Sequence, residues 1–156
     1  MTLDQIQLEA GQTSLGNTSF YLDSGKDPLY PFGYGLSYST FEYSDLTLSS
    51  SSIPMDGTLT VKVTLRNTSK VDGTEVAQLY IQDIVGSVVR PVKELKGFQR
   101  IHLKAGEEKE VVFEITPELL EQLNEELKSV VEPGIFRIMI GSSSRDLPLK
   151  ADLEVR

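Results

Sequence analysis

Residues 59–66 decide the fold, and they read Leu-Thr-Val-Lys-Val-Thr-Leu-Arg. Apolar and polar side chains alternate at every position, and this period of two favours a strand over a helix, whose period is 3.6. One face of such a strand is buried and the other meets water. We expect the buried face to consist of Leu59, Val61, Val63 and Leu65.

The same alternation recurs at residues 74–83, 110–116, 135–141 and 147–155, and a first strand is expected at about 41–50. The inward side chains would be Ala77, Leu79, Ile81, Val111, Phe113, Ile115, Phe136, Ile138, Ile140, Leu147, Leu149, Ala151, Leu153 and Val155. Turn signals separate the runs at Asp56-Gly57, Asp72-Gly73, Ala105-Gly106 and Pro133-Gly134. Short strands at this spacing predict an all-β sandwich.

One helix is expected, beginning after Thr116 as N-cap and running to about Asn124. Pro117 would occupy its first position, and Glu118 and Glu121 would lie near its positive end. In a sandwich this helix would be a short crossover on one edge.

The composition excludes several classes of partner and chemistry. The 156 residues suit one domain, and a net charge of -8, with 15 basic against 23 acidic side chains, argues against nucleic acid. No apolar run approaches the roughly 20 residues of a membrane span, and residues 1–9 lack the features of an export signal. The absence of cysteine rules out disulfides and thiolate chemistry but does not fix the compartment.

Catalytic and metal-binding constellations are not expected in this chain. The single histidine, His102, falls on the outward side of its strand beside Ile101 and Leu103, where solvation is favoured over a catalytic role. A lone histidine cannot anchor a typical zinc site, and no calcium or phosphate loop is present in the sequence. We therefore expect no catalytic residue, no cofactor and no metal.

Residues 28–38, Pro-Leu-Tyr-Pro-Phe-Gly-Tyr-Gly-Leu-Ser-Tyr, are rich in aromatic rings but too broken by Pro and Gly for a core strand or helix. This predicts a structured tether that docks on a surface outside the chain. The same rings could instead stack on sugars, although the Pro and Gly setting favours docking. The candidate docking residues are Tyr30, Pro31, Phe32, Tyr34, Leu36 and Tyr38, together with Arg90 and Pro91 of a later loop.

Several segments, taken in order, resemble the C-terminal fibronectin type III-like domain of glycoside hydrolase family 3, the β-glucosidase and β-xylosidase group. They are residues 28–44, 67–69 with 72–73, 76–81, 90–98, 103–107, 132–136 and 140–144. Each segment alone is weak, but together they span about residues 20–156. Residues 1–19 match no part of the family, and we expect them to be loosely held.

The resemblance implies an immunoglobulin-like, fibronectin type III-like β-sandwich of about seven strands at residues 41–156, after an arm and docking segment at 1–40. Members of the family carry their nucleophile Asp and acid/base Glu on two domains N-terminal to this one, and no motif here matches either. The implied function is accessory: the domain would pack on the catalytic domains of the same enzyme, stabilise them and shape the rim of their pocket.

Two alternatives stay open, a stand-alone carbohydrate-binding module and a protein-interaction domain. The resemblance also implies a periplasmic or extracellular parent enzyme. The isolated domain, with its docking rings exposed, is expected to form a weak dimer.

Overall fold

The computed structural model describes residues 28–84, 92–124 and 126–156. The chain divides into two compact units, Met1–Tyr30 and Pro31–Arg156, and every element below belongs to the second. The expectation of a loosely held segment at residues 1–19 lies outside the described residues. No helix in the described ranges is long and apolar enough to cross a membrane.

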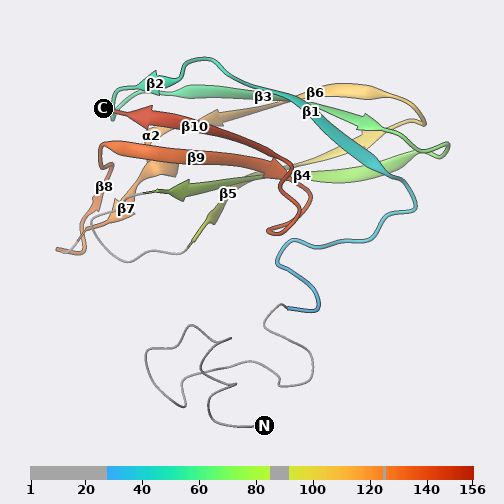
Figure 1. The fold of residues 1–156 in the computed structure, drawn as a ribbon, viewed down its shortest axis with the longest axis horizontal. Coiled ribbons are helices and arrows are strands. Elements are labelled where there is room, and N and C mark those ends of the chain that lie inside the picture. Colours follow the sequence, from blue (N-terminus) through green and yellow to red (C-terminus); the bar gives the residue numbers. More distant parts are fainter. Residues whose placement is uncertain (1–27, 85–91, 125) are drawn as a thin grey trace, which may run out of the picture. The chain divides into compact units, whose positions relative to one another are not determined.

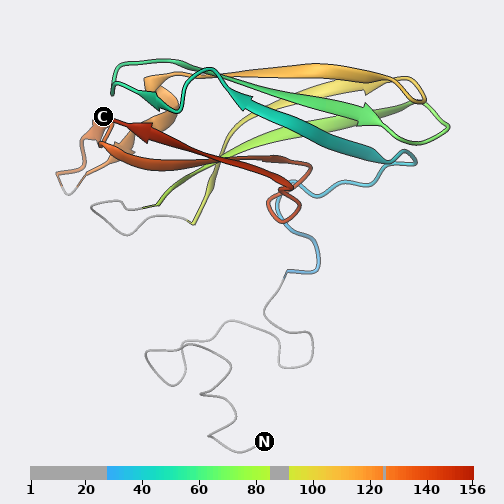
Figure 2. The ribbon, with the colours of Figure 1, turned by 45° about the horizontal axis from the view of Figure 1, so that its top comes forward.

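Two sheets form a sandwich, which confirms the predicted fold class. The three-stranded sheet has the order β1-β3-β6, with bounds Phe41–Leu48, Leu59–Asn67 and Glu108–Ile115. The five-stranded sheet has the order β2-β10-β9-β4-β5, with bounds Ser52–Ile53, Leu149–Val155, Gly134–Gly141, Gly73–Asp83 and Glu94–Leu103. Figures 1 and 2 show the two sheets as separate layers. Seven of these strands have seven or more residues, as expected, while β2 has two.

The core fills the space between the layers with the side chains that the alternation placed inward. In β3, β4, β6 and β9 each of these side chains is at most 6% exposed. In β10, Leu153 and Val155 are buried, and Leu149 and Ala151 are half-buried. Alternation identified this face correctly because the sandwich buries one side of each strand.

A second, smaller apolar cluster lies on the outer face of the five-stranded sheet. It joins Tyr80 of β4 and Met139 of β9 to Leu147, with Leu95 packed against them. The prediction that Leu147 lies inward on a strand is therefore wrong. Residues 142–148 form a loop instead, and the Ser142 amide donates to the Asp146 carbonyl oxygen at 3.0 Å, which folds Leu147 back over the sheet.

The helix is shorter than predicted. The helix α2 spans Pro117–Leu120, and Glu121 already has extended backbone angles. The next residues, β7 at Gln122–Leu123, pair with β8 at Ser129–Val130 in a small antiparallel hairpin. Pro117 stands near the helix N-terminus as expected, but Thr116 makes no side-chain capping hydrogen bond. Cross-strand pairing thus replaces the last turn of the predicted helix.

Candidate functional site

The aromatic segment is held on the sandwich by its backbone. The Phe32 carbonyl oxygen accepts a hydrogen bond from the Ser144 amide at 2.9 Å. The Gly33 carbonyl oxygen accepts one from the side-chain amide of Gln78, also at 2.9 Å. The Tyr34 amide donates to the Pro31 carbonyl oxygen at 3.0 Å, which closes a turn. Contacts from β4 and from the loop after β9 therefore fix residues 32–34.

Gln78 makes this attachment specific. Its side chain is buried, and its Nε2 also donates to the Ser142 carbonyl oxygen at 2.5 Å, while its Oε1 accepts from the Tyr80 hydroxyl at 2.7 Å. Gly33 has a φ of +78°, and a Cβ there would overlap the Gln78 amide. Glycine is thus required at residue 33 both by its backbone conformation and by the close approach of Gln78.

The other end of the segment is held by Ser39. Its hydroxyl is buried and lies 3.1 Å from the carbonyl oxygens of both Val71 and Asp72. Gly73, at the start of β4, leaves the room for this hydroxyl, because a Cβ at Gly73 would overlap it. The segment from residue 32 to residue 39 therefore has both ends anchored.

Between these anchors, large apolar side chains point away from the core. Tyr34 is 48% exposed and Phe32 67%, and Leu36 and Tyr38 are almost fully exposed. A monomeric soluble domain rarely presents several such groups together without a use for them. The segment offers apolar contact area on a backbone that is already ordered.

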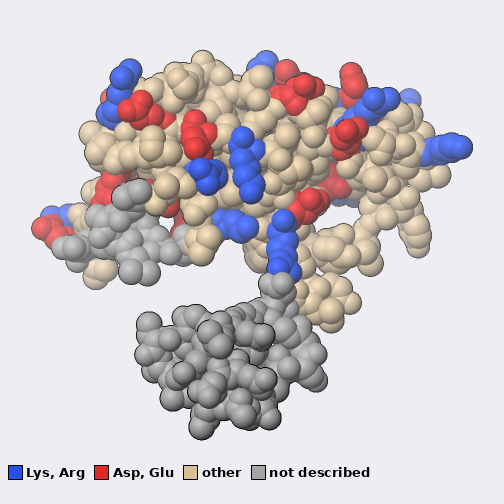
Figure 3. All heavy atoms as spheres, viewed as in Figure 1, with Lys and Arg blue, Asp and Glu red and all other residues tan. Residues whose placement is uncertain are grey.

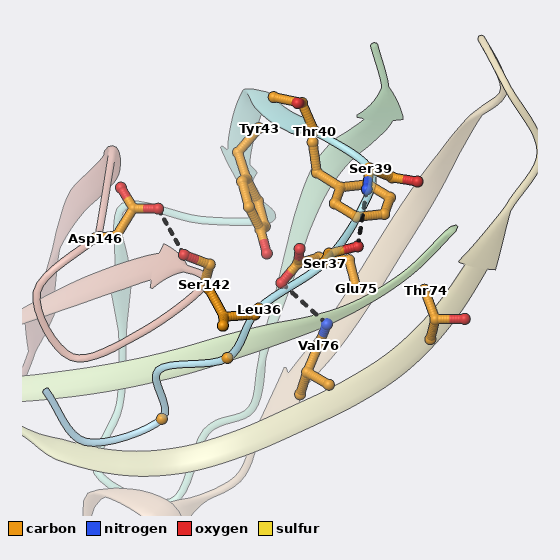
Figure 4. Close-up of a pocket in the computed structure, with 13 residues that line it drawn as sticks. Leu36, Ser37, Ser39, Thr40, Tyr43, Thr74, Glu75, Val76, Ser142 and Asp146 are labelled. Carbon is orange, nitrogen blue, oxygen red and sulfur yellow. Dashed lines mark hydrogen bonds between the residues drawn. The ribbon is translucent and has the colours of Figure 1, made fainter. Parts of the chain in front are cut away.

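A pocket of about 320 Å³ lies behind the segment, between residues 33–40, β1, β4 and the loop at 142–146 (Figure 4). Hydroxyl groups supply much of its lining, from Ser37, Ser39, Thr40, Thr74 and Ser142. Two carboxylates, Glu75 and Asp146, and the ring of Tyr43 complete its polar floor. Both carboxylates already accept hydrogen bonds from the protein, Glu75 from the Val76 amide at 3.0 Å and Asp146 from the Ser142 hydroxyl at 2.5 Å.

Burial controls the electrostatics of this floor. It raises the pKa of Glu75 above the ordinary value of 4.5, and the nearby charge of Asp146 adds to the effect, whereas the hydrogen bond from the Val76 amide opposes it. Burial, followed by the charge of Glu75, also raises the pKa of Tyr43 well above its usual range. Among the described residues, no group of three or more His, Asp or Glu side chains is arranged to hold a metal ion. The pocket is therefore suited to hydrogen bonding with polar groups.

A family profile described as a fibronectin type III-like domain matches residues 75–144, which run from β4 to the loop after β9. The match assigns this stretch to the fibronectin type III-like domains. The two-layer sandwich of seven long strands that the whole domain forms agrees with that assignment.

Relatives extend the match beyond the profile. The domain is 47% identical over 145 residues to a putative beta-xylosidase of Formosa agariphila, covering 93% of this chain and 19% of that protein. It is 51% identical over 127 residues to a periplasmic beta-glucosidase of Salmonella typhimurium, covering 81% and 17%. A beta-glucosidase from Listeria innocua, solved in complex with glucose, matches with a TM-score of 0.79 and 45% identity over 89% of this chain and 19% of that one. The resemblance to the domain of family 3 glycoside hydrolases is confirmed, and the domain spans about a fifth of these relatives' length.

The structure brings together only part of the predicted docking set. Pro31, Phe32, Tyr34, Leu36 and Tyr38 lie along one anchored segment of the domain. Tyr30 is 69% exposed but belongs to the other compact unit. Arg90 and Pro91 lie outside the described residues. The docking role of these residues stays a prediction.

The sequence analysis missed one exposed ring, Phe98 of β5, which is 67% exposed. It lies directly opposite Gln78 in the pairing of β4 with β5. A signal was available, because Phe98 has the same parity along the strand as His102, which was placed outward and is exposed.

Proposed function

We propose that this domain is a non-catalytic accessory domain of a larger glycoside hydrolase of the β-glucosidase type, and that residues 31–38 dock it on the catalytic domains. The observation that carries the proposal is the exposure of Phe32, Tyr34, Leu36 and Tyr38 on a backbone anchored at Gln78, Ser144 and Val71. The similarity to a fifth of the length of β-glucosidases and a β-xylosidase supports it.

An anchored segment suits this task for an energetic reason. Ordering a flexible linker on binding costs conformational entropy, whereas residues 32–39 are already fixed by their hydrogen bonds. Aromatic rings then supply contact area with few rotatable bonds. Docking in this way would stabilise the catalytic domains and shape the rim of their pocket. We place the parent enzyme in the periplasm or outside the cell, in line with the periplasmic relative.

A chimera tests the proposal. Residues 28–156 replace the matching segment of the Salmonella typhimurium periplasmic β-glucosidase, and the same enzyme truncated before that segment serves as the comparison. We expect the chimera to be soluble and to melt well above the truncated enzyme, and Phe32→Ser with Tyr34→Ser to remove part of that gain. The proposal is wrong if the truncated enzyme equals the chimera in stability and activity, or if the chimera is insoluble while the natural enzyme is not.

The pocket behind the segment favours one alternative, a carbohydrate-binding module. Its hydroxyls and carboxylates could bind sugar hydroxyls, and the exposed rings could stack on a sugar face. Affinity electrophoresis in gels containing soluble β-glucan or xylan separates the two functions. A docking domain migrates as it does in a plain gel, whereas a carbohydrate-binding module is retarded.

A further inference from the structure

We propose that the docking surface extends from the anchored segment onto the outer face of the five-stranded sheet, with Phe98 as a second anchor and Arg100 as its charged neighbour. Its occupant would be an apolar patch with an acidic rim on the catalytic part of the longer chain. This inference rests on the proposed function and adds the sheet face and the chemistry of the partner.

Gln78 connects Phe98 to the anchored aromatic segment, because it neighbours both of them. The two residues are directly opposite each other in adjacent antiparallel strands, which places their Cβ atoms about 5 Å apart. The Gln78 amide in turn binds the Gly33 carbonyl oxygen. Gly97 faces the core, since a Cβ there would lie 3.5 Å from the ring of Phe113, so its neighbour Phe98 points outward. The exposed rings of Phe32 and Phe98 thus belong to neighbouring parts of one surface.

The rest of this sheet face shows that the exposure of Phe98 is particular. Of the other large apolar side chains that point outward from β4 and β9, Tyr80 and Met139 are buried in the second cluster beneath Leu147, whereas Ile135, at the start of β9, is 40% exposed. Phe98 has no such cover. An exposed aromatic ring next to an apolar cluster that the chain itself buries indicates a site of contact with another surface.

The charges on the two outer faces of the sandwich identify the partner. On the five-stranded sheet, Arg100 follows Phe98 on the same side of β5, is exposed, and has no hydrogen-bond or ion-pair partner among the described residues. Arg137 on this face is paired with Asp152 at 2.8 Å. Both signs of charge are interspersed over the side that Figure 3 shows.

The outer face of the three-stranded sheet is different. The residues that point outward from β6 are Glu108, Glu110, Val112 and Glu114. Glu110 forms an ion pair with Lys62 at 3.0 Å, and Arg66 of β3 lies opposite Glu108, so acids outnumber bases on this face. A partner with an acidic rim would be repelled by this face and attracted by Arg100.

Charge also argues against a second copy as the occupant. A symmetric dimer built on this sheet face would bring Arg100 toward its own counterpart, and the whole chain carries -8. A neutral sugar could accept hydrogen bonds from Arg100 but would supply no opposite charge for it. An apolar patch with an acidic rim, on the catalytic part of the longer chain, would cover the ring of Phe98 and provide an opposite charge for Arg100.

Single substitutions in the chimera test the inference. Phe98→Ser removes the second anchor, and Val112→Ser, which also shortens an exposed apolar side chain on a strand, is the matched control. In the isolated chain we expect both to leave the melting temperature within about 2 °C. In the chimera, Phe98→Ser should lower it by about 2 °C or more, while Val112→Ser leaves it unchanged. Arg100→Glu should lower it as well, and less so in 0.5 M salt, because salt screens the repulsion.

The outcomes separate the two proposals. If Phe32→Ser with Tyr34→Ser weakens the chimera but Phe98→Ser and Arg100→Glu do not, the inference is overturned and the proposed function stands. If truncation itself has no effect, the proposed function fails first. If Phe98→Ser unfolds the isolated chain, Phe98 is structural, and Arg100→Glu decides whether this face is part of the docking surface.

Discussion

The side-chain amide of Gln78 donates a hydrogen bond to the carbonyl oxygen of Gly33 at 2.9 Å, which joins an irregular segment to an interior strand of the sandwich. The same amide binds Ser142 and accepts from Tyr80, so the buried polar groups of Gln78 are used. A buried amide without these partners would cost about 1–3 kcal/mol for each unsatisfied group. The order of the aromatic segment therefore depends on a few specific hydrogen bonds.

Gly33→Ala should lower the free energy of unfolding by about 1–3 kcal/mol. The φ of +78° disfavours a side chain, and the new Cβ would overlap the Gln78 amide. Gly35→Ala is the matched control, because no atom lies within 4 Å of a Cβ there, and we expect a change within about 0.5 kcal/mol. Urea unfolding of both variants gives the comparison, and equal effects would contradict the anchoring of residue 33.

Phe113→Ala should destabilise the domain by about 3–5 kcal/mol, since it removes a buried ring between the two sheets and leaves a cavity. Val112 is the adjacent control, because its side chain is 41% exposed on the outer face of β6. Val112→Ala is expected to cost much less. A loss below about 1 kcal/mol for Phe113→Ala, measured by chemical denaturation, would be incompatible with its place in the core.

The fold was predictable because the two sheets bury one face of each long strand, and alternation reports this directly. It failed at Leu147, where residues 142–148 turn back over the outer face and bury an apolar side chain against Tyr80 and Met139. The helix prediction also failed after Leu120, where pairing between β7 and β8 overrides local helix signals. The first error arises from a contact distant in sequence, between Leu147 and Tyr80, and the second from a local hairpin that competes with the helix.

The candidate site was only partly predictable, for a similar reason. Composition identified residues 28–38, because Pro and Gly among aromatic rings are visible in the sequence. The pocket behind them depends on side chains that come together only in the folded sandwich, from Tyr43 on β1, Glu75 on β4 and Asp146 in a loop (Figure 4). Strand register, which places Phe98 opposite Gln78, is likewise a property of the sheet.

Glu75→Gln should change stability in a pH-dependent way. Burial raises the folded-state pKa of Glu75 above 4.5, so its contribution is fully present below that pH and is lost as the pH rises through the folded-state pKa. Glutamine resembles the protonated form. The variant should therefore gain stability over the wild type at pH 7 and show little difference at pH 4, as measured by urea unfolding at both values.

The groups that face Glu75 in the pocket are Tyr43 and Asp146. Glu114→Gln, on the exposed side of β6, is the control and should change stability by about 0.5 kcal/mol or less at both pH values. A loss of stability in Glu75→Gln at pH 7 would mean that the Val76 hydrogen bond to the carboxylate outweighs its burial.

The chain alone should hydrolyse no glycoside, because no motif in it matches the nucleophile or acid/base of the family and its two pocket carboxylates already accept hydrogen bonds from the protein. Nitrophenyl β-glucoside and β-xyloside at high protein concentration provide the assay. Turnover that copurifies with the chain and disappears in Glu75→Gln or Asp146→Asn would contradict the accessory role.

The isolated domain should form a weak dimer through its anchored aromatic segment. Phe32, Tyr34, Leu36 and Tyr38 are exposed on an ordered backbone, and association of two copies would remove part of this apolar surface from water. The net charge of -8 on each copy opposes association, so the dimer should appear only at high concentration and be favoured by salt.

Phe32→Ser combined with Tyr34→Ser should make the chain monomeric in sedimentation velocity at every concentration tested, with a nearly unchanged melting temperature. The melting temperature should change little because these rings lie outside both apolar clusters of the domain. The hydrogen bonds of the segment to Ser144 and Gln78 are made by its backbone and do not involve the rings. Val112→Ser, on the opposite sheet, should leave the dimer intact. If the double variant unfolds instead, the rings contribute to the fold itself, and their assignment as a docking surface is wrong.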